Sequence, residues 1–229
     1  MSERPILMSG PMVRAILREV NPKTQTRRIV KPQPAVKTVT WGCTAGQGFG
    51  FSFGGGPRIS CPFGDPGDQL WVKETWRYHD WTEDGEPFVE YAADGTVKLC
   101  TELDEVWREK TGDIWAKLSV RENFRIDGRA ADRKWRPSIH MPRWASRITL
   151  KIADVRVECL QDISEEDAIA EGASPHRPEP ENFSCRAYPW EPHKVGFSLL
   201  WDSLNGKRPG ASWADNPWVW AITFERMPS

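Results

Sequence analysis

The sequence has no long hydrophobic run and no excess of charge of either sign. Its longest strongly apolar stretch, Trp218 to Phe224, is far shorter than the roughly 20 residues of a membrane-spanning helix. No basic start leads into an apolar stretch near Met1, as a secretion signal requires. With 31 Lys+Arg against 32 Asp+Glu and 39% hydrophobic residues, the composition argues against intrinsic disorder and against a polybasic nucleic-acid binder. We therefore expect a globular cytoplasmic protein with no membrane partner.

Cysteine is scarce, and its pattern is not that of a metal site. The 5 cysteines are widely spread, with no Cys-x-x-Cys pair and no His at zinc-finger spacing: Cys43, Cys61, Cys100, Cys159 and Cys185. We expect reduced structural thiols, no metal and no organic cofactor, because the sequence contains no ligand cluster. Tyr is also rare, at 3 residues, whereas Trp is abundant at 13. Trp is usually a packing residue, so its abundance alone does not indicate a ligand site.

What the chain does contain is a series of short periodic elements, and its 229 residues favour one domain. Ser9 can cap a first helix and Pro11 suits its first turn. The apolar stripe of that helix is Met12, Val13, Ile16, Leu17 and Val20. Asn21-Pro22 ends it. Lys23 to Val30 then has strand propensity, but its threonines and adjacent charges are unusual for a buried strand.

Three further segments have strand periodicity. Gln69 to Trp76 alternates, and one face carries Leu70, Val72, Glu74 and Trp76. Arg147 to Leu160 predicts one long bent strand or a hairpin, interrupted at Ala153-Asp154. Trp218 to Met227 is apolar on both faces, which predicts a central strand.

A short helix is predicted after Ser164, which is a good N-cap, with Asp167 at the reciprocal capping position and Gly172 as the stop. Glu171 therefore lies at the helix C-terminus, where the macrodipole disfavours a carboxylate. Such a group suits a general acid or base, although a surface glutamate beside a helix-ending glycine is the plainer interpretation. A later helix, ended by Asn205-Gly206, carries Phe197, Leu200, Trp201 and Leu204 and is predicted to be a packing helix.

Charge is segregated along the chain. Glu74 to Asp113 has 12 acidic and 4 basic residues, a net charge of −8. Arg121 to Lys151 has 9 basic and 3 acidic residues, a net charge of +6. The basic part interleaves aromatic side chains in Arg133–Arg136 and His140–Arg147, a composition typical of contact with phosphates and bases. Mutual attraction of the two patches, or two solvated faces, explains the pattern equally well. The Gly-rich residues 31 to 67 predict a long irregular excursion, without the following helix of a phosphate-binding loop.

A small β-barrel with short helices and large loops accounts for this order of elements. The residues also resemble a known family, the ASCH domain. The resemblance rests on Lys23-Thr24-x-Thr26-x-Arg28, Pro66-Gly67-Asp68-x-Leu70-x-Val72, Glu171-Gly172 and the closing strand Trp218 to Phe224. A longer signature, in residues 137–147 and 160–166, resembles ASCH proteins of bacteria and their phages.

The ASCH resemblance implies an α+β fold, a PUA-like β-barrel with short flanking helices, and a role in binding RNA or modified nucleotides. It covers residues 1–229 as one domain, with long loop insertions at about 31–67, 77–138 and 174–216. Its partner would therefore be a modified nucleoside or RNA.

Within the family, the sequence is similar to members that hydrolyse N4-acetylcytidine to cytidine and acetate. That likeness implies catalytic roles for Lys23, Thr26 and Glu171, whereas Gln25 and Arg27 replace apolar residues of those members. Candidate substrate-binding residues come from the motif that begins at Lys23, from the strand Gln69 to Trp76 and from the basic segment. They are Arg28, Glu74, Trp76, His140, Arg143 and Trp144.

The chemistry leaves two routes open. On a regular strand Lys23 and Thr26 would point to opposite faces, so we expect Lys23 on the turn after Pro22, from which its long stem can reach back. A neutral Lys23 can accept the Thr26 proton, and the alkoxide then attacks an amide carbonyl while Glu171 protonates the leaving amine. Alternatively, Glu171 activates water and Lys23 stabilises the oxyanion.

Three functions remain open at this point. The first is an amidohydrolase acting on N4-acylated cytidine or cytosine nucleosides. The second is a non-catalytic module that binds RNA or a modified nucleotide. The third and weakest is a ribonuclease that uses Lys23, Glu171 and His140, because no pattern places His140 near the other two.

Overall fold

The structure is a computed structural model that describes residues 2–35, 39–44, 48–56, 58–82, 86–101, 105, 108–110, 112–113, 134–176 and 191–228. The chain divides into two compact units. Unit 1 comprises residues 1–4, 15–70 and 150–227. Unit 2 comprises residues 5–14, 71–149 and 228–229. The single domain with three insertions stays a prediction.

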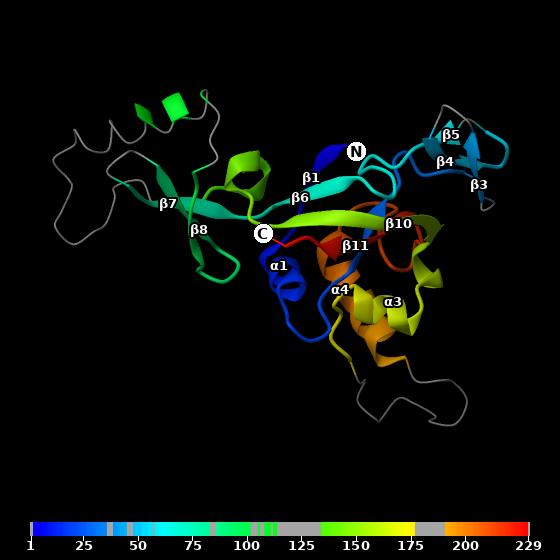
Figure 1. The fold of residues 1–229 in the computed structure, drawn as a ribbon. Coiled ribbons are helices and arrows are strands. Elements are labelled where there is room, and N and C mark those ends of the chain that lie inside the picture. Colours follow the sequence, from blue (N-terminus) through cyan, green and yellow to red (C-terminus); the bar gives the residue numbers. More distant parts are fainter. Residues whose placement is uncertain are drawn as a thin grey trace. The chain divides into compact units, whose positions relative to one another are not determined.

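The largest sheet has five strands in the order β1-β6-β10-β11-β2 (Figure 1). Its strands are β1 (Glu3–Leu7), β2 (Gln25–Ile29), β6 (Gln69–Lys73), β10 (Thr149–Cys159) and β11 (Trp218–Arg226). β11 pairs antiparallel with β10 on one side and β2 on the other, so it is central, as its two apolar faces predict. β10 is one bent strand, and its register shifts between Ile152 and Asp154, where the sequence predicts an interruption.

The helices with bounds inside the described ranges are α1 (Gly10–Ile16), α3 (Glu165–Ala170) and the longer α4 (Pro192–Asn205). The 3-10 turns there are η1 (Ser138–His140), η2 (Arg143–Ala145) and η3 (Leu160–Asp162). The predicted first helix is wrong at its end: α1 stops at Ile16, and Val20 is 76% exposed. The cap of α3 is confirmed, because the Ser164 hydroxyl accepts a hydrogen bond from the Asp167 backbone N–H at 3.1 Å.

In unit 1, α3 and α4 pack together under β11 (Figure 1). Their shared core is Leu160, Ile163, Ala168, Ala173, Phe197, Trp201 and Val219. Gly172 has φ +76, the left-handed conformation that commonly follows a helix end. α4 packs as predicted through Phe197 and Trp201, although Leu200 and Leu204 are exposed.

The predicted irregular excursion at 31–67 is wrong, because the structure forms a three-stranded antiparallel sheet there. Its strands are β3 (Val39–Thr44), β4 (Gly48–Phe53) and β5 (Arg58–Ile59). In the same unit, Phe51 lies edge-on to Trp220 with ring centroids 5.3 Å apart, and Phe53 lies edge-on to Trp218 at 5.2 Å. In β4 glycines alternate with phenylalanines. Glycine has low strand propensity, so this segment was not predicted to be a strand.

Unit 2 contains another antiparallel sheet in a region where the sequence pattern is weak. Its strands are β7 (Trp76–Trp81), β8 (Pro87–Tyr91) and β9 (Val97–Leu99). A core cluster of Trp76, Tyr78, Val89, Tyr91, Cys100, Met141 and Ala145 lies against it. Acidic residues interrupt the alternation of apolar and polar residues in this region, so the strands were not predicted. The aromatic residues of the cluster pack as a core, which is their usual role.

The structure is therefore α+β, as predicted, with short helices and several sheets. The sheets formed by the described strands are open, and the closed barrel is not among them. Within the described residues, no helix has the length and apolar character needed to cross a bilayer. Cys61 and Cys100 are buried, and Cys159 is half-buried.

Candidate functional site

Lys23 is held on a turn between α1 and β2, as expected from its place after Pro22. Its backbone N–H donates to the Ala15 carbonyl at 2.9 Å. The next residue, Thr24, donates to the Ala170 carbonyl at 2.8 Å, and the Thr24 carbonyl accepts from Phe224 at 2.8 Å. This turn is thus fixed to the ends of α1 and α3 and to β11, and the Lys23 side chain enters the interior of unit 1.

Lys23 and Glu171 form a buried ion pair. The Lys23 Nζ donates to the Glu171 Oε2 at 2.5 Å and to the Glu171 backbone carbonyl at 2.7 Å. Only 3% of Lys23 and 6% of Glu171 are exposed. Burial lowers the pKa of Lys23 below its ordinary value, and Arg27 and Arg28 lower it further, while Glu171 opposes this shift. Both residues are predicted from the sequence as catalytic, and the structure brings them together.

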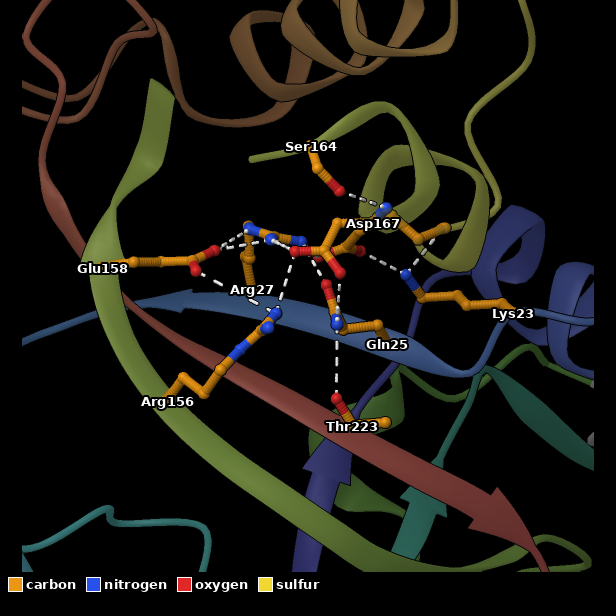
Figure 2. Close-up of polar contacts among 9 residues, drawn as sticks. Lys23, Gln25, Arg27, Arg156, Glu158, Ser164, Asp167 and Thr223 are labelled. Carbon is orange, nitrogen blue, oxygen red and sulfur yellow. Dashed lines mark hydrogen bonds and ion pairs between the residues drawn. The ribbon is translucent and has the colours of Figure 1, made fainter. Parts of the chain in front are cut away.

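Arg27 lies beside this pair and was not among the predicted site residues. Figure 2 shows its guanidinium between Glu158 and Asp167. Its Nε and Nη2 donate to the Glu158 Oε1 at 2.9 and 2.5 Å, and Nη2 also donates to the Asp167 Oδ2 at 2.8 Å. Its Nη1 donates to the Gln25 Oε1 at 2.5 Å and lies 3.4 Å from the Glu171 Oε1. Arg27 therefore connects β2 to β10 and α3.

The same network extends to the surface of unit 1. The Gln25 amide donates to the Asp167 Oδ1 at 3.0 Å and to the Thr223 hydroxyl at 3.2 Å (Figure 2). Arg156, which is 45% exposed at its side chain, donates to the Asp167 Oδ2 at 2.8 Å. Burial raises the pKa of Asp167, but hydrogen bonds from Gln25 and the charges of Arg27 and Arg156 outweigh it, so the pKa lies below its ordinary value.

Thr26, the third predicted catalytic residue, is buried on β2 opposite Ile222 of β11. Strand alternation directs its side chain away from the face that carries Gln25 and Arg27. Among the described residues its hydroxyl has no hydrogen bond to Lys23 or Glu171. Arg28 is half-buried, and burial lowers its pKa. The structure therefore joins Lys23 to Glu171 but not to Thr26.

The other predicted binding residues belong to unit 2. Glu74 is buried and accepts two hydrogen bonds from Arg147, each at 2.9 Å. Burial raises the pKa of Glu74, although Arg147 counteracts this. Trp76 lies in the core, and the half-buried Trp144 packs against the same cluster. These contacts are those of residues that stabilise unit 2.

His140 and Arg143, the remaining predicted binding residues, are exposed in unit 2. Of the basic segment, residues 121–133 lie outside the described residues, so Arg133 does too. The ribonuclease stays a prediction, because it needs His140 beside Lys23 and Glu171, and His140 belongs to unit 2 whereas the other two residues belong to unit 1.

Two pairs of residues that are not among the predicted site residues build the polar face of the sheet. Gln25 and Arg27 alternate on β2, while Arg156 and Glu158 alternate on β10. Polar residues at alternate positions in two buried or half-buried strands are a signal that they share one face. The alternation of polar residues can be seen in the sequence. It does not reveal that β11 lies between β2 and β10, which the strand order shows.

The donor set is suited to proton transfer. Within the described ranges no three His, Cys, Asp or Glu side chains gather as metal ligands would. The available chemistry is a buried ammonium that can stabilise an oxyanion and a carboxylate that can accept or return a proton.

Comparisons with protein-family profiles, with curated proteins and with solved structures give no match. The function of the protein is therefore inferred from its sequence motif and from the geometry of unit 1.

Proposed function

We propose that this protein is an amidohydrolase that removes acyl groups from N4-acylated cytidine or cytosine nucleosides, on an ASCH-type, PUA-like scaffold. The observation that carries the proposal is the buried ion pair of Lys23 and Glu171. It joins two parts of the ASCH-like motif that are 148 positions apart in the sequence. The PUA-like barrel is part of this proposal.

A purely structural ion pair is a weaker explanation of this arrangement. Removing two charges from water costs several kcal/mol per ion, about as much as their attraction returns. Glu171 also lies at the C-terminal end of α3, where the helix dipole disfavours an anion. Buried, mutually dependent titratable groups of this kind are concentrated at functional sites.

The contacts favour the route in which water is the nucleophile. Glu171 takes a proton from water as the oxygen attacks the acyl carbonyl carbon, and the carbonyl electrons move to its oxygen. Lys23 remains charged and stabilises that oxyanion. When the intermediate collapses, the C–N bond breaks, Glu171 returns the proton to the departing exocyclic amine, and the carboxylic acid and cytidine are the products.

The alternative route, through a Thr26 alkoxide, requires more rearrangement. Lys23 would have to lose its proton and its hydrogen bonds to Glu171 before it could accept a proton from Thr26. The acyl group would then form an ester on Thr26, which water would hydrolyse.

The test is release of cytidine from N4-acetylcytidine, followed by ultraviolet absorbance. Lys23→Met and Glu171→Gln should each lower kcat by about 100-fold or more, the usual effect of removing an oxyanion-stabilising or proton-transferring group. Lys98→Met is the matched control, because it removes an exposed lysine from β9 of unit 2. Activity that survives both site substitutions would exclude this site, and an inactive wild-type protein would exclude the reaction.

A non-catalytic RNA-binding module is the second candidate, and one observation favours it. Trp135 is 44% exposed, and the Arg77 guanidinium lies 4.3 Å from its ring centroid in unit 2. Exposed Arg143 and His140 belong to the same basic, aromatic segment. Binding of a single-stranded RNA that weakens steeply with salt and with Trp135→Ala, in a protein without hydrolase activity, would establish this function instead.

A further inference from the structure

We propose that Arg27 is a positioning residue that fixes the orientation of the Glu171 carboxylate toward Lys23. This inference rests on the proposed function where it concerns turnover, and on geometry alone where it concerns Lys23 and Glu171.

The guanidinium of Arg27 is fully committed. Arginine has five N–H donors in a rigid planar fork. Here each nitrogen has acceptors that match its N–H groups: Nε bonds Glu158, Nη2 bonds Glu158 and Asp167, and Nη1 contacts Gln25 and Glu171. Because all directions of the fork are used, the guanidinium plane cannot turn without breaking a buried hydrogen bond.

The acceptors are themselves fixed. Asp167 stands in the first turn of α3 and also receives hydrogen bonds from Gln25 and Arg156. The Gln25 amide is anchored in turn on the Thr223 hydroxyl of β11. Figure 2 shows these partners around Arg27. The contact that Arg27 makes with Glu171 is thus supported by three elements of unit 1: β10, β11 and α3.

The carboxylate of Glu171 is held from two sides. Its Oε2 accepts from Lys23 at 2.5 Å, and its Oε1 lies 3.4 Å from the Arg27 Nη1. The Arg27 contact is long for a hydrogen bond, so it steers the carboxylate electrostatically without withdrawing it from Lys23. A cation at this place also offsets the unfavourable dipole at the C-terminal end of α3.

The effect of losing Arg27 on the pKa of Lys23 follows from the charged groups that face Lys23. Glu171 stands at the end of α3, and Arg27 and Arg28 lie on β2. Removing Arg27 removes a nearby positive charge and one of the cations that attract the Glu171 carboxylate, which keeps its ion pair with Lys23 and the attraction of Arg28. Both changes favour the ammonium form, so the pKa of Lys23 should rise.

The experiment is a titration of Lys23 by nuclear magnetic resonance of its side-chain Cε and Nζ, with kinetics on N4-acetylcytidine for the same proteins. We expect Arg27→Gln to raise the pKa of Lys23 and to lower kcat by about 10- to 100-fold with little change in KM, since misorientation acts on the reacting groups. Arg27→Lys keeps the charge but lacks the fork, so it should lower kcat while changing the pKa of Lys23 less.

Arg208→Gln is the matched control. Arg208 is an exposed arginine of unit 1 that follows α4 and lies outside the hydrogen-bond network around Arg27. Its replacement should therefore leave both the Lys23 titration and kcat unchanged. If Arg27→Gln fails to fold, Arg27→Lys carries the test alone.

The outcomes separate the two proposals. An unchanged Lys23 titration and unchanged kcat in the Arg27 variants would overturn the positioning role while leaving the proposed function intact. A shifted Lys23 titration in a protein that never hydrolyses N4-acylcytidine would support the positioning role and overturn the proposed function.

Discussion

Lys23 bonds both the backbone and the side chain of Glu171, through its Nζ at 2.7 Å to the carbonyl and 2.5 Å to the carboxylate. The carbonyls at a helix C-terminus lack intrahelical partners, so this ammonium also caps α3. One cation therefore supports the end of the helix and holds the carboxylate that the helix presents. Changes to this turn should affect stability and reactivity together.

The pH dependence of turnover should separate the two chemical routes. If Lys23 acts as an ammonium, kcat/KM falls as pH rises through its pKa, which burial has lowered. If Lys23 acts as the base for Thr26, kcat/KM rises through the same pKa. We expect the fall, and we expect Thr26→Ala to retain activity within about 10-fold, because removal of a true nucleophile costs orders of magnitude more. Activity lost in Thr26→Ala but kept in Thr26→Ser would support the alkoxide route.

Gly172→Ala should destabilise the protein and disturb Lys23. Gly172 has φ +76, and an added Cβ would lie 3.1 Å from the Ala15 Cβ and 3.4 Å from the Lys23 Cβ. The left-handed conformation alone costs about 1–2 kcal/mol for a residue with a Cβ. Gly95→Ala is the control, since Gly95 has φ +74 with nothing within 4 Å of the added atom. Urea unfolding should show the larger loss for Gly172→Ala, and equal losses would contradict the packing contact.

Arg147→Met should lower the free energy of unfolding by about 3–5 kcal/mol, because it leaves Glu74 buried without its partner. The side chain of Glu74 is 1% exposed, and that of Arg147 is 10% exposed. Asp94→Asn removes the outer partner of Arg147 and should cost at most about 1 kcal/mol, as for exposed ion pairs. Chemical denaturation measures both. A small loss in Arg147→Met would return Glu74 to the list of candidate binding residues.

Acid should weaken unit 1 through Asp167, whose pKa in the folded protein lies below its ordinary value of 3.8. A carboxylate with a lowered pKa contributes its stability above the unfolded value and loses it as pH falls through the folded value. Stability measured by thermal unfolding should therefore decline below about pH 4, and Asp167→Asn should make that decline shallower. An identical slope in the variant would mean that other carboxylates carry the acid sensitivity.

Much of the local structure could be predicted from the sequence, because its causes lie within a few residues. The cap of α3 at Ser164 and its stop at Gly172 depend on neighbouring backbone groups. The central position of β11 follows from its two apolar faces. The end of α1 was missed, since an apolar residue such as Val20 can fit a helical stripe and still be exposed.

The strands within residues 31–67 were missed for another reason. Glycine carries no side chain that would show which face of a strand is buried, so β4 could not be recognised from its own residues. Its pairing with β3 in the structure defines it as a strand. Pairing between strands is a property of the folded chain, and the local pattern of a Gly-rich strand specifies it weakly.

Short-range patterns in the sequence predict the periodic elements, the position of Lys23 on a turn and that of Glu171 at a helix end, because capping and alternation act over short distances. The fold adds three relations: these two residues meet, Thr26 is not joined to them, and Arg27 contacts the other carboxylate oxygen of Glu171. Those relations depend on the order β10-β11-β2 and on the docking of α3, where hydrogen-bond geometry requires agreement within a few tenths of an ångström. No short-range pattern of residues can specify such a distance.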